Sequence, residues 1–155
     1  MKKANVLRAF AVVAAVGIGV FALWSPSNAG GQTIPYTDTD AVARGTGIYT
    51  DYCASCHGAN LEGQENWRFR GPDGMALAPP HDASGHTWHH PDAVLVDITT
   101  RGTAAVVGRG YESNMIGYGD ILTEQEILDV LAYIKSTWPP ELIEAHNGIN
   151  AEAGN

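Results

Sequence analysis

The sequence has few cysteines, few basic residues and no pattern typical of β-strands. Two cysteines among 155 residues are too few for a disulfide-stabilised scaffold. After the first 29 residues the chain carries six basic side chains against 17 acidic ones, a balance of −11. Nucleic-acid binding and docking on anionic lipid both need clusters of basic residues, so this balance argues against both. A hydrophobic content of 45% argues against disorder, and the length suggests one domain.

The N-terminal segment has the composition of an export signal. Basic residues lie within the first eight positions, a 16-residue apolar run follows over 9–24, and Ser27–Ala29 has the small-x-small pattern of a cleavage site. We therefore predict a signal peptide over residues 1–29 and a mature protein that is periplasmic or otherwise exported. The alternative is an uncleaved N-terminal anchor, which would be the protein's membrane contact, although 16 residues are short for a membrane span.

Helix-forming patterns lie over residues 38–57, 91–100 and 123–138. The last is the clearest, because Thr123 and Glu126 have the spacing of a capping box and apolar residues follow at helical intervals. No segment shows the alternation of a half-buried strand. The sequence therefore predicts an all-α fold.

The same patterns divide the chain into a folded domain and its flanks. Residues 38–138 form the predicted domain, and residues 30–37 form an extended leader before it. A proline pair is expected to end the last helix. The C-terminal tail, 139–155, is expected to be frayed, with His146 exposed to solvent.

Two long Gly- and Pro-rich loops join the predicted helices, over residues 58–90 and 101–122. Loops of this length are unusual inside a compact domain and usually have a function. Three short helices with so much irregular chain bury too little apolar surface for a stable fold. We therefore expect a bulky apolar group to fill the centre of the domain.

The sequence Cys53-Ala54-Ser55-Cys56-His57 indicates what that group is, because C-x-x-C-H is the attachment pattern of c-type haem. Two cysteines at this spacing at a helix end can each form a thioether bond to one porphyrin vinyl group. The histidine that follows can then bind the iron. We predict one covalently attached haem c, held by Cys53, Cys56 and His57.

Other interpretations of the two cysteines fit the sequence less well. A thioredoxin-like dithiol needs a β-α-β context, which is missing. A disulfide between them would close a very small loop and add little stability. A zinc site shared with His86 and His90 would need a longer separation from Cys56 than zinc fingers have.

An electron-carrying haem needs a second axial ligand opposite His57. Met115 is the predicted ligand, because it lies 58 residues beyond His57, far enough for the chain to wrap around the haem. His/Met ligation is also a usual arrangement in electron carriers. Met75, only 18 residues beyond His57, and a nearby histidine are the alternatives. Tyr118 is a candidate hydrogen-bond donor to the Met115 sulfur, or else a core residue.

These residues resemble the class I cytochromes c, which are small monohaem electron carriers. The resemblance rests on Gly45 and Tyr49 before the C-x-x-C-H-G pattern, on Met115, and on the segment Leu122–Lys135; it covers most of residues 38–138. It implies a cytochrome c-like fold of three to four helices wrapped around one haem. With both axial positions filled there is no open position for a substrate, so we expect no enzymatic activity.

The resemblance also implies two specific contacts. In this family the first and last helices cross with a glycine of one against an aromatic residue of the other, and Gly45 and Tyr133 are the matching pair. A proline carbonyl accepts the Nδ1 hydrogen of the haem-binding histidine, and Pro79 or Pro80 matches that position. This bond would fix the imidazole and strengthen its donation to iron. One departure is Ile116, since proline often follows the ligand methionine in this family.

The first long loop contains a cluster of aromatic and imidazole side chains: His81, His86, Trp88, His89 and His90. The favoured interpretation is that Trp88 and one or two of the histidines hydrogen-bond the haem propionates, while His89 and His90 cap the following helix. A second metal such as copper is an alternative, because imidazole is a good copper ligand. His81 also departs from the family pattern, which often has an apolar residue there.

We therefore predict a monohaem cytochrome that carries one electron at a time between redox partner proteins. A balance of −11 on the mature chain favours partners with a basic docking patch, which would speed the encounter. One alternative is a haem protein with an open or displaceable sixth position, either an enzyme or a small-ligand binder. Another is a copper-handling haem protein that uses the loop from His81 to His90.

Overall fold

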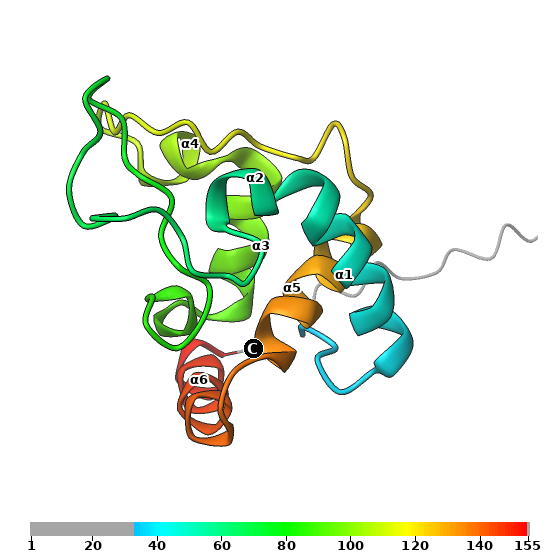
Figure 1. The fold of residues 1–155 in the computed structure, drawn as a ribbon. Coiled ribbons are helices and arrows are strands. Elements are labelled where there is room, and N and C mark those ends of the chain that lie inside the picture. Colours follow the sequence, from blue (N-terminus) through cyan, green and yellow to red (C-terminus); the bar gives the residue numbers. More distant parts are fainter. Residues whose placement is uncertain (1–32, 155) are drawn as a thin grey trace, which may run out of the picture.

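The computed structural model describes residues 33–154, so the predicted signal peptide and residues 30–32 lie outside the described residues. Within 33–154 the chain is helical and contains no strand, which confirms the all-α prediction (Figure 1). The helices are α1 (Thr39–Tyr52), α2 (Ala54–His57), the 3₁₀ helix η1 (Thr87–His89), α3 (Asp92–Arg101), α4 (Thr103–Val107), α5 (Glu124–Ser136) and α6 (Pro140–Ala153). No helix in this range is long and apolar enough to cross a membrane.

The first predicted helix is two helices in the structure. Asp38 begins α1, because its carboxylate accepts hydrogen bonds from the backbone N–H groups of Asp40 and Ala41. α1 ends at Tyr52, and Cys53 joins it to the single turn of α2. α2 ends at His57 and is capped by Gly58, whose φ of +82° is a conformation that side chains disfavour.

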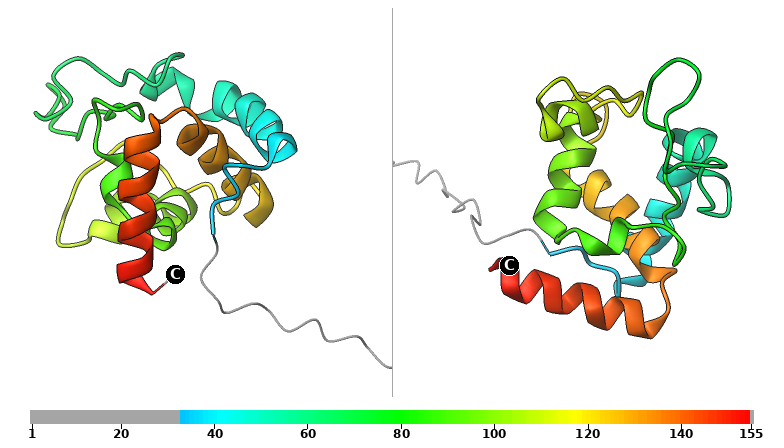
Figure 2. Two further views of the ribbon diagram at one scale, coloured as in Figure 1. Left: turned by 90° about the horizontal axis from the view of Figure 1, so that it is seen from below. Right: turned by 90° about the vertical axis from the view of Figure 1, so that its left-hand side faces the viewer.

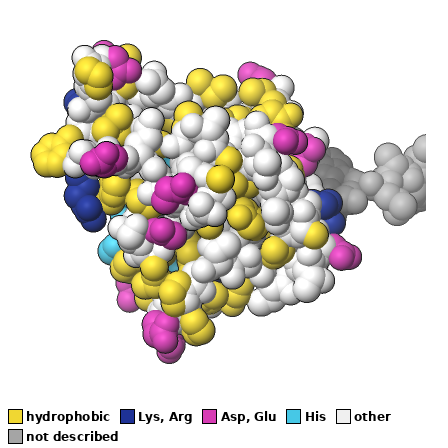
Figure 3. Space-filling model, viewed as in Figure 1, with side chains coloured by type: hydrophobic (Ala, Val, Ile, Leu, Met, Phe, Trp, Pro, Cys, Tyr) yellow, Lys and Arg dark blue, Asp and Glu magenta, His cyan; other side chains and the backbone are white. Residues whose placement is uncertain are grey.

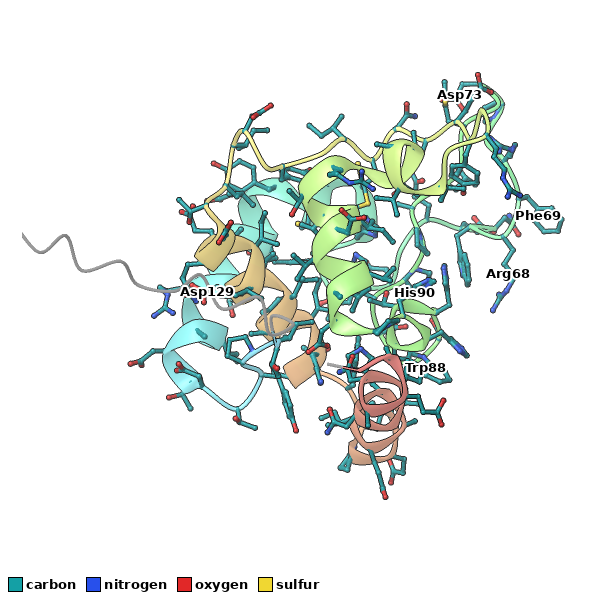
Figure 4. The ribbon with its side chains drawn as sticks, turned by 180° about the vertical axis from the view of Figure 1, so that it is seen from behind. Arg68, Phe69, Asp73, Trp88, His90 and Asp129 are labelled. Carbon is teal, nitrogen blue, oxygen red and sulfur yellow. The ribbon has the colours of Figure 1, made fainter. Side chains whose placement is uncertain are left out.

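The crossing of α1 over α5 is the closest helix contact. A Cβ atom on Gly45 would lie 1.9 Å from the backbone oxygen of Asp129 and 3.0 Å from the Cβ of Tyr133, so only glycine allows this approach. The predicted pairing of Gly45 with Tyr133 is therefore confirmed. Arg44 and Asp129 form an ion pair at 2.6 Å beside the crossing, where Figure 4 shows Asp129 between the two helices.

The capping box predicted for the last helix of the domain is present. Thr123 accepts a hydrogen bond from the backbone N–H of Glu126, and the Glu126 carboxylate accepts one from the backbone N–H of Thr123. The apolar residues that follow at helical spacing are buried: Ile127, Val130, Leu131, Ile134 and, just past the helix, Trp138. This face of α5 and the inner face of α1 form the core of the domain.

The segment after the proline pair is a helix, so the prediction of a frayed tail is wrong, as is the prediction that His146 is exposed. His146 is 0% exposed, and its Nε2 donates to the backbone oxygen of His90 at 2.8 Å. Asn150 bonds to both the backbone N–H and the carboxylate of Asp92. These contacts hold α6 along one edge of the molecule, below α3 and α5 in the right-hand view of Figure 2.

The two long loops differ in how well they were predicted. Residues 58–90 are irregular except for η1 at their end, as expected. The predicted second loop, 101–122, contains the short helix α4, which was not predicted from the sequence. An isolated backbone bridge joins Ala76 of the first loop to Ser113 of the second, and the Ala76 N–H donates to the backbone oxygen of Glu112 at 3.2 Å. The two loops thus brace each other at one end of the molecule.

Candidate functional site

The C-x-x-C-H motif lies at the junction of α1 and α2. Cys53 is half-buried, Cys56 is exposed, and the two are not joined by a disulfide, so the disulfide interpretation finds no support. Burial raises the pKa of the Cys53 thiol to about 11, and the neighbouring Cys56 adds to this rise. Both sulfurs are therefore available for other bonds.

His57, at the end of α2, is a buried imidazole held in one tautomer. Its Nδ1 lies 2.8 Å from the backbone oxygen of Pro79, and a carbonyl can only accept, so Nδ1 carries the hydrogen. Of the two prolines that the sequence indicated, Pro79 makes this bond; the Pro80 oxygen faces Thr87 at 3.5 Å. Burial lowers the pKa of His57, while the bond to Pro79 opposes this. Nε2 is left with a free lone pair, the form in which imidazole binds a metal.

His81 lies beside His57, not opposite it. The two rings are stacked with centroids 4.0 Å apart and planes 23° apart. The Nδ1 of His81 hydrogen-bonds the hydroxyl of Thr87 at 2.8 Å. Because His81 packs against the face of the His57 ring, this position does not favour His81 as the ligand opposite His57.

The sulfur of Met115 is held by a hydroxyl from another element. Thr103, the first residue of α4, donates to the Met115 Sδ at 3.2 Å. Tyr118, the candidate donor from sequence, does not: its hydroxyl donates to the backbone oxygen of Tyr52 at 2.8 Å. Tyr118 packs against the core, which agrees with the other role predicted for it. Its bond places the Met115 loop against the residue that precedes Cys53.

The other end of the Met115 loop is anchored on α3. Ile116 forms an isolated bridge with Gly102, and a Cβ on Gly117 would lie 2.6 Å from the backbone oxygen of Thr100. Met75, the alternative ligand, lies in a separate turn closed by the bond from Gly71 N–H to its own oxygen. The choice of Met115 over Met75 as the ligand stays a prediction.

Two buried polar atoms near the histidine loop have no hydrogen-bond partner in the described residues, Nε1 of Trp88 and Nδ1 of His86. An unpaired buried N–H is costly, so each such group needs an explanation. A propionate oxygen is an acceptor of the kind Trp88 requires. The residues present thus fit a bound haem, and the roles of Trp88 and one histidine toward its propionates stay predictions.

The remaining histidines of the loop do not act as predicted. Neither His89 nor His90 caps the N-terminus of α3, which Pro91 precedes. The first N–H of this helix, that of Asp92, donates to the side-chain oxygen of Asn150 in α6. Within residues 33–154 no group of three or more His, Cys, Asp or Glu side chains is placed to hold a metal ion. His86 stacks on Trp67 with ring centroids 5.1 Å apart, and His89 stacks on Trp88 with ring centroids 3.7 Å apart. The copper alternative therefore finds no site in the described part.

Three contacts of the site were missed from sequence. They are the Thr103 hydroxyl on Met115, the Thr87 hydroxyl on His81, and the bond from the Tyr49 hydroxyl to the backbone oxygen of Gly58 at 2.8 Å. The first two join segments whose proximity depends on the fold, so no local pattern signals them. The Tyr49 bond lies within the quoted family pattern, where the tyrosine precedes the motif at helical spacing.

Comparison with known proteins agrees with this geometry. A cytochrome c family model matches residues 42–138. The chain is also 29% identical over 96 residues to a nitrite reductase of Stutzerimonas stutzeri, an alignment that covers 61% of this chain and 16% of that protein. No solved structure matches. Because the matched segment spans both cysteines, His57, Met115 and the α1–α5 crossing, the chain belongs to the cytochrome c family.

Proposed function

We propose that this protein is a monohaem electron carrier, with one haem c attached through Cys53 and Cys56 and with His57 and Met115 as its axial ligands. The group would supply a single iron that changes charge by one unit. The chain's own residues hold the ligands, exclude water and receive partner proteins. We propose that it works in the periplasm or another exported compartment, where the predicted signal would deliver it.

The observation that carries this proposal is the state of His57. Its buried ring donates Nδ1–H to Pro79 and is thereby fixed with Nε2 free, one residue after Cys56. Such a bond from the second ring nitrogen orients a ligand histidine and raises its basicity. A histidine that served only to fill the core would not need a free Nε2 beside two cysteines.

The experiment that tests the proposal is an optical spectrum of the purified protein in both redox states, with a measured reduction potential. We expect covalently attached haem, a low-spin spectrum and the sulfur-to-iron charge-transfer band of the ferric form. Replacement of Met115 by Ala should abolish that band, make the haem high-spin or misligated, and lower the potential, because methionine ligation raises it. An unchanged spectrum in Met115→Ala would show that another residue is the ligand.

The surface around the motif offers an exit for electrons. Cys56 is exposed, and Tyr52, Ile116 and Ile121 are each between 41% and 56% exposed although they are large and apolar. Tyr118 joins Tyr52 to the Met115 loop, so these residues surround the same region. Transient redox complexes are small, and an apolar patch of this kind suits them.

The negative net charge of the molecule favours partner proteins with a positively charged surface. Acidic side chains are spread over the face in Figure 3, whereas basic ones are visible only at its margins. Partners with a basic docking patch would therefore be steered to it. The second-order rate of reduction by a cationic cytochrome should fall steeply as ionic strength rises, because salt screens the attraction. A rate that did not change with salt would contradict the steering.

One observation favours a second candidate, a haem protein whose sixth ligand can be displaced by a small molecule. The similarity to part of a nitrite reductase admits a role inside an enzyme system, although the shared segment is only 16% of that protein. Exposure of the ferrous protein to carbon monoxide discriminates the two. Rapid binding with Met115 intact would favour the second candidate, and no binding would favour the electron carrier.

A further inference from the structure

The side chain of His81 stacks on the ring of His57, and the proposed function gives it no role. Its ring lies face to face with the His57 ring, with centroids 4.0 Å apart and planes 23° apart. Tyr49 approaches His81 edge-on, with ring centroids 6.4 Å apart. The ring of His81 is thus enclosed between two aromatic neighbours, one of which is the haem-binding histidine.

Hydrogen bonds hold both the ring and the main chain of His81. Its Nδ1 hydrogen-bonds Thr87 Oγ1 at 2.8 Å, and Thr87 is itself buried. Its backbone oxygen accepts from Trp138 Nε1 at 2.7 Å, and its backbone N–H donates to the oxygen of Leu61 at 2.8 Å. The hydrogen bonds therefore fix both the main chain and the tilt of the ring.

We propose that His81 is a positioning residue that sets the plane of the His57 imidazole. The inference rests on the proposed function, because it requires that His57 binds the haem iron. The Pro79 carbonyl restrains one edge of the His57 ring through Nδ1, and the stacked His81 ring restrains its face. A leucine would fill the same space, but its contact does not depend on the angle of the ring plane, whereas two flat rings prefer defined offsets.

The plane of an axial imidazole has a spectroscopic signature. In low-spin ferric haem, the orientation of the ligand π system determines how the unpaired spin is distributed over the porphyrin. The shifts of the four haem methyl protons and the anisotropy of the electron paramagnetic resonance spectrum report that orientation directly. A side chain that contributed only to folding would leave both unchanged.

The test compares His81→Leu, His81→Phe and Thr87→Val in the protein with its haem attached. We expect His81→Leu to change the order and spread of the haem methyl resonances and to alter the g anisotropy. His81→Phe keeps a flat ring on His57 and should stay close to the wild type. Thr87→Val removes the bond that fixes the tilt of His81 and should shift the same signals in the direction of His81→Leu.

Wild-type signals in His81→Leu and in Thr87→Val would overturn the inference. If His81→Leu does not yield folded protein, the comparison of Thr87→Val with the wild type decides the question. The proposed function is judged separately, on the wild-type protein alone. A wild type without a low-spin haem would refute that function, whereas a low-spin wild type with unaltered variants would refute only the role of His81.

Discussion

At the scale of single residues, the two proposed axial ligands differ in what surrounds them. His57 donates to a backbone oxygen, which increases its electron density, whereas the sulfur of Met115 accepts from the Thr103 hydroxyl at 3.2 Å, which withdraws it. When the sulfur donates less electron density, ferric iron is destabilised more than ferrous iron. The hydroxyl hydrogen, directed at the sulfur, would also add a partial positive charge next to the ligand of a bound iron. Both effects of Thr103 raise the reduction potential.

Replacement of Thr103 by Val should therefore lower the potential. Valine keeps the shape of threonine and removes only the donor. A hydrogen bond of about 0.5–1.5 kcal/mol that is felt in one redox state corresponds to roughly 20–60 mV for one electron. Voltammetry of the variant measures the shift, and the charge-transfer band shows that the sulfur remains bound. A potential that rises in Thr103→Val would contradict the argument.

How far the site could be predicted depends on the distance in sequence between its parts. Cys53, Cys56 and His57 are adjacent, so the chemistry that they share is visible in five residues. The acceptor of the His57 Nδ1 hydrogen could be predicted only through the family resemblance, and only as one of two residues, Pro79 or Pro80. Thr103 was not identified, because its closeness to Met115 is created by the fold of α4 against the loop.

At the scale of helices, the crossing of α1 and α5 depends on a missing side chain. Gly45 lies where a Cβ would be 1.9 Å from a backbone oxygen of α5, and that oxygen belongs to a helix held by the core. Gly47, two residues later in α1, has no atom within 4 Å of its own Cβ position. The two glycines share one helix and differ only in what they face.

Substitution by alanine should therefore have opposite effects at these two positions. Gly45→Ala should destabilise the protein by about 2 kcal/mol or more, because the helices must separate to admit the methyl group. Gly47→Ala should stabilise it by up to about 1 kcal/mol, because alanine is the better helix former. Denaturant unfolding of both holoproteins measures the difference. Equal effects would mean that the close crossing does not contribute to stability.

The C-terminal helix α6 rests on a buried polar cluster, in which His146 faces Asp92 at 3.5 Å and Lys135 lies close by. The Nδ1 of His146 is buried with no partner in the described residues, so a proton added there would have no acceptor. Burial lowers the pKa of His146, and the nearby Lys135 adds to this effect. Compared with the unfolded chain, the folded protein therefore favours the neutral form of His146, although the bond to His90 and the charge of Asp92 oppose this.

Because the pKa of His146 is lower in the folded than in the unfolded protein, its effect on stability has a definite sign. Above about pH 6.5 both states are neutral at this residue and nothing changes. As the pH falls below that value, His146 binds a proton more readily in the unfolded chain than in the folded one, so the free energy of unfolding decreases. Between pH 7.5 and 5 the wild type should lose on the order of 1 kcal/mol more than His146→Gln.

Thermal unfolding at several pH values measures this difference, and the exposed His89 offers a control. His89→Gln removes an imidazole from the surface, outside the cluster under α6, and should keep the acid sensitivity of the wild type. An acid sensitivity in His146→Gln equal to that of the wild type would assign the effect to other buried groups.

The helices also show which elements the sequence could predict. The capping box of Thr123 and Glu126 is a local pattern, and it located α5 correctly. α6 carried a local signal as well, since Pro140 is well suited to the first turn of a helix. The partners that hold it, however, lie 56 and 58 residues away in His90 and Asp92, and no local pattern indicates them.

At the scale of the whole molecule, the described core is small for a chain of this length. The buried apolar residues come mainly from α1, α5 and the segments beside them. The loops 58–90 and 101–122 contribute Leu61 and Leu122, and α3 contributes Leu95. Within residues 33–154, the buried Nε1 of Trp88 and Nδ1 of His86 have no hydrogen-bond partner. An attached haem would supply both apolar contact and acceptors, so the group that performs the chemistry would also complete the core.

The double variant Cys53→Ala, Cys56→Ala tests that dependence. Without the thioether bonds the protein should be isolated without covalent haem, and much of the core contact around His57 should be lost. We expect far-ultraviolet circular dichroism to show that most of the helix content is lost and that no cooperative thermal transition remains, because small domains with incomplete cores are marginally stable. Gly47→Ala, carried through the same purification, controls for handling. A double variant that kept wild-type helix content and a cooperative transition would show that the polypeptide forms its core unaided, with the haem bound into a preformed fold.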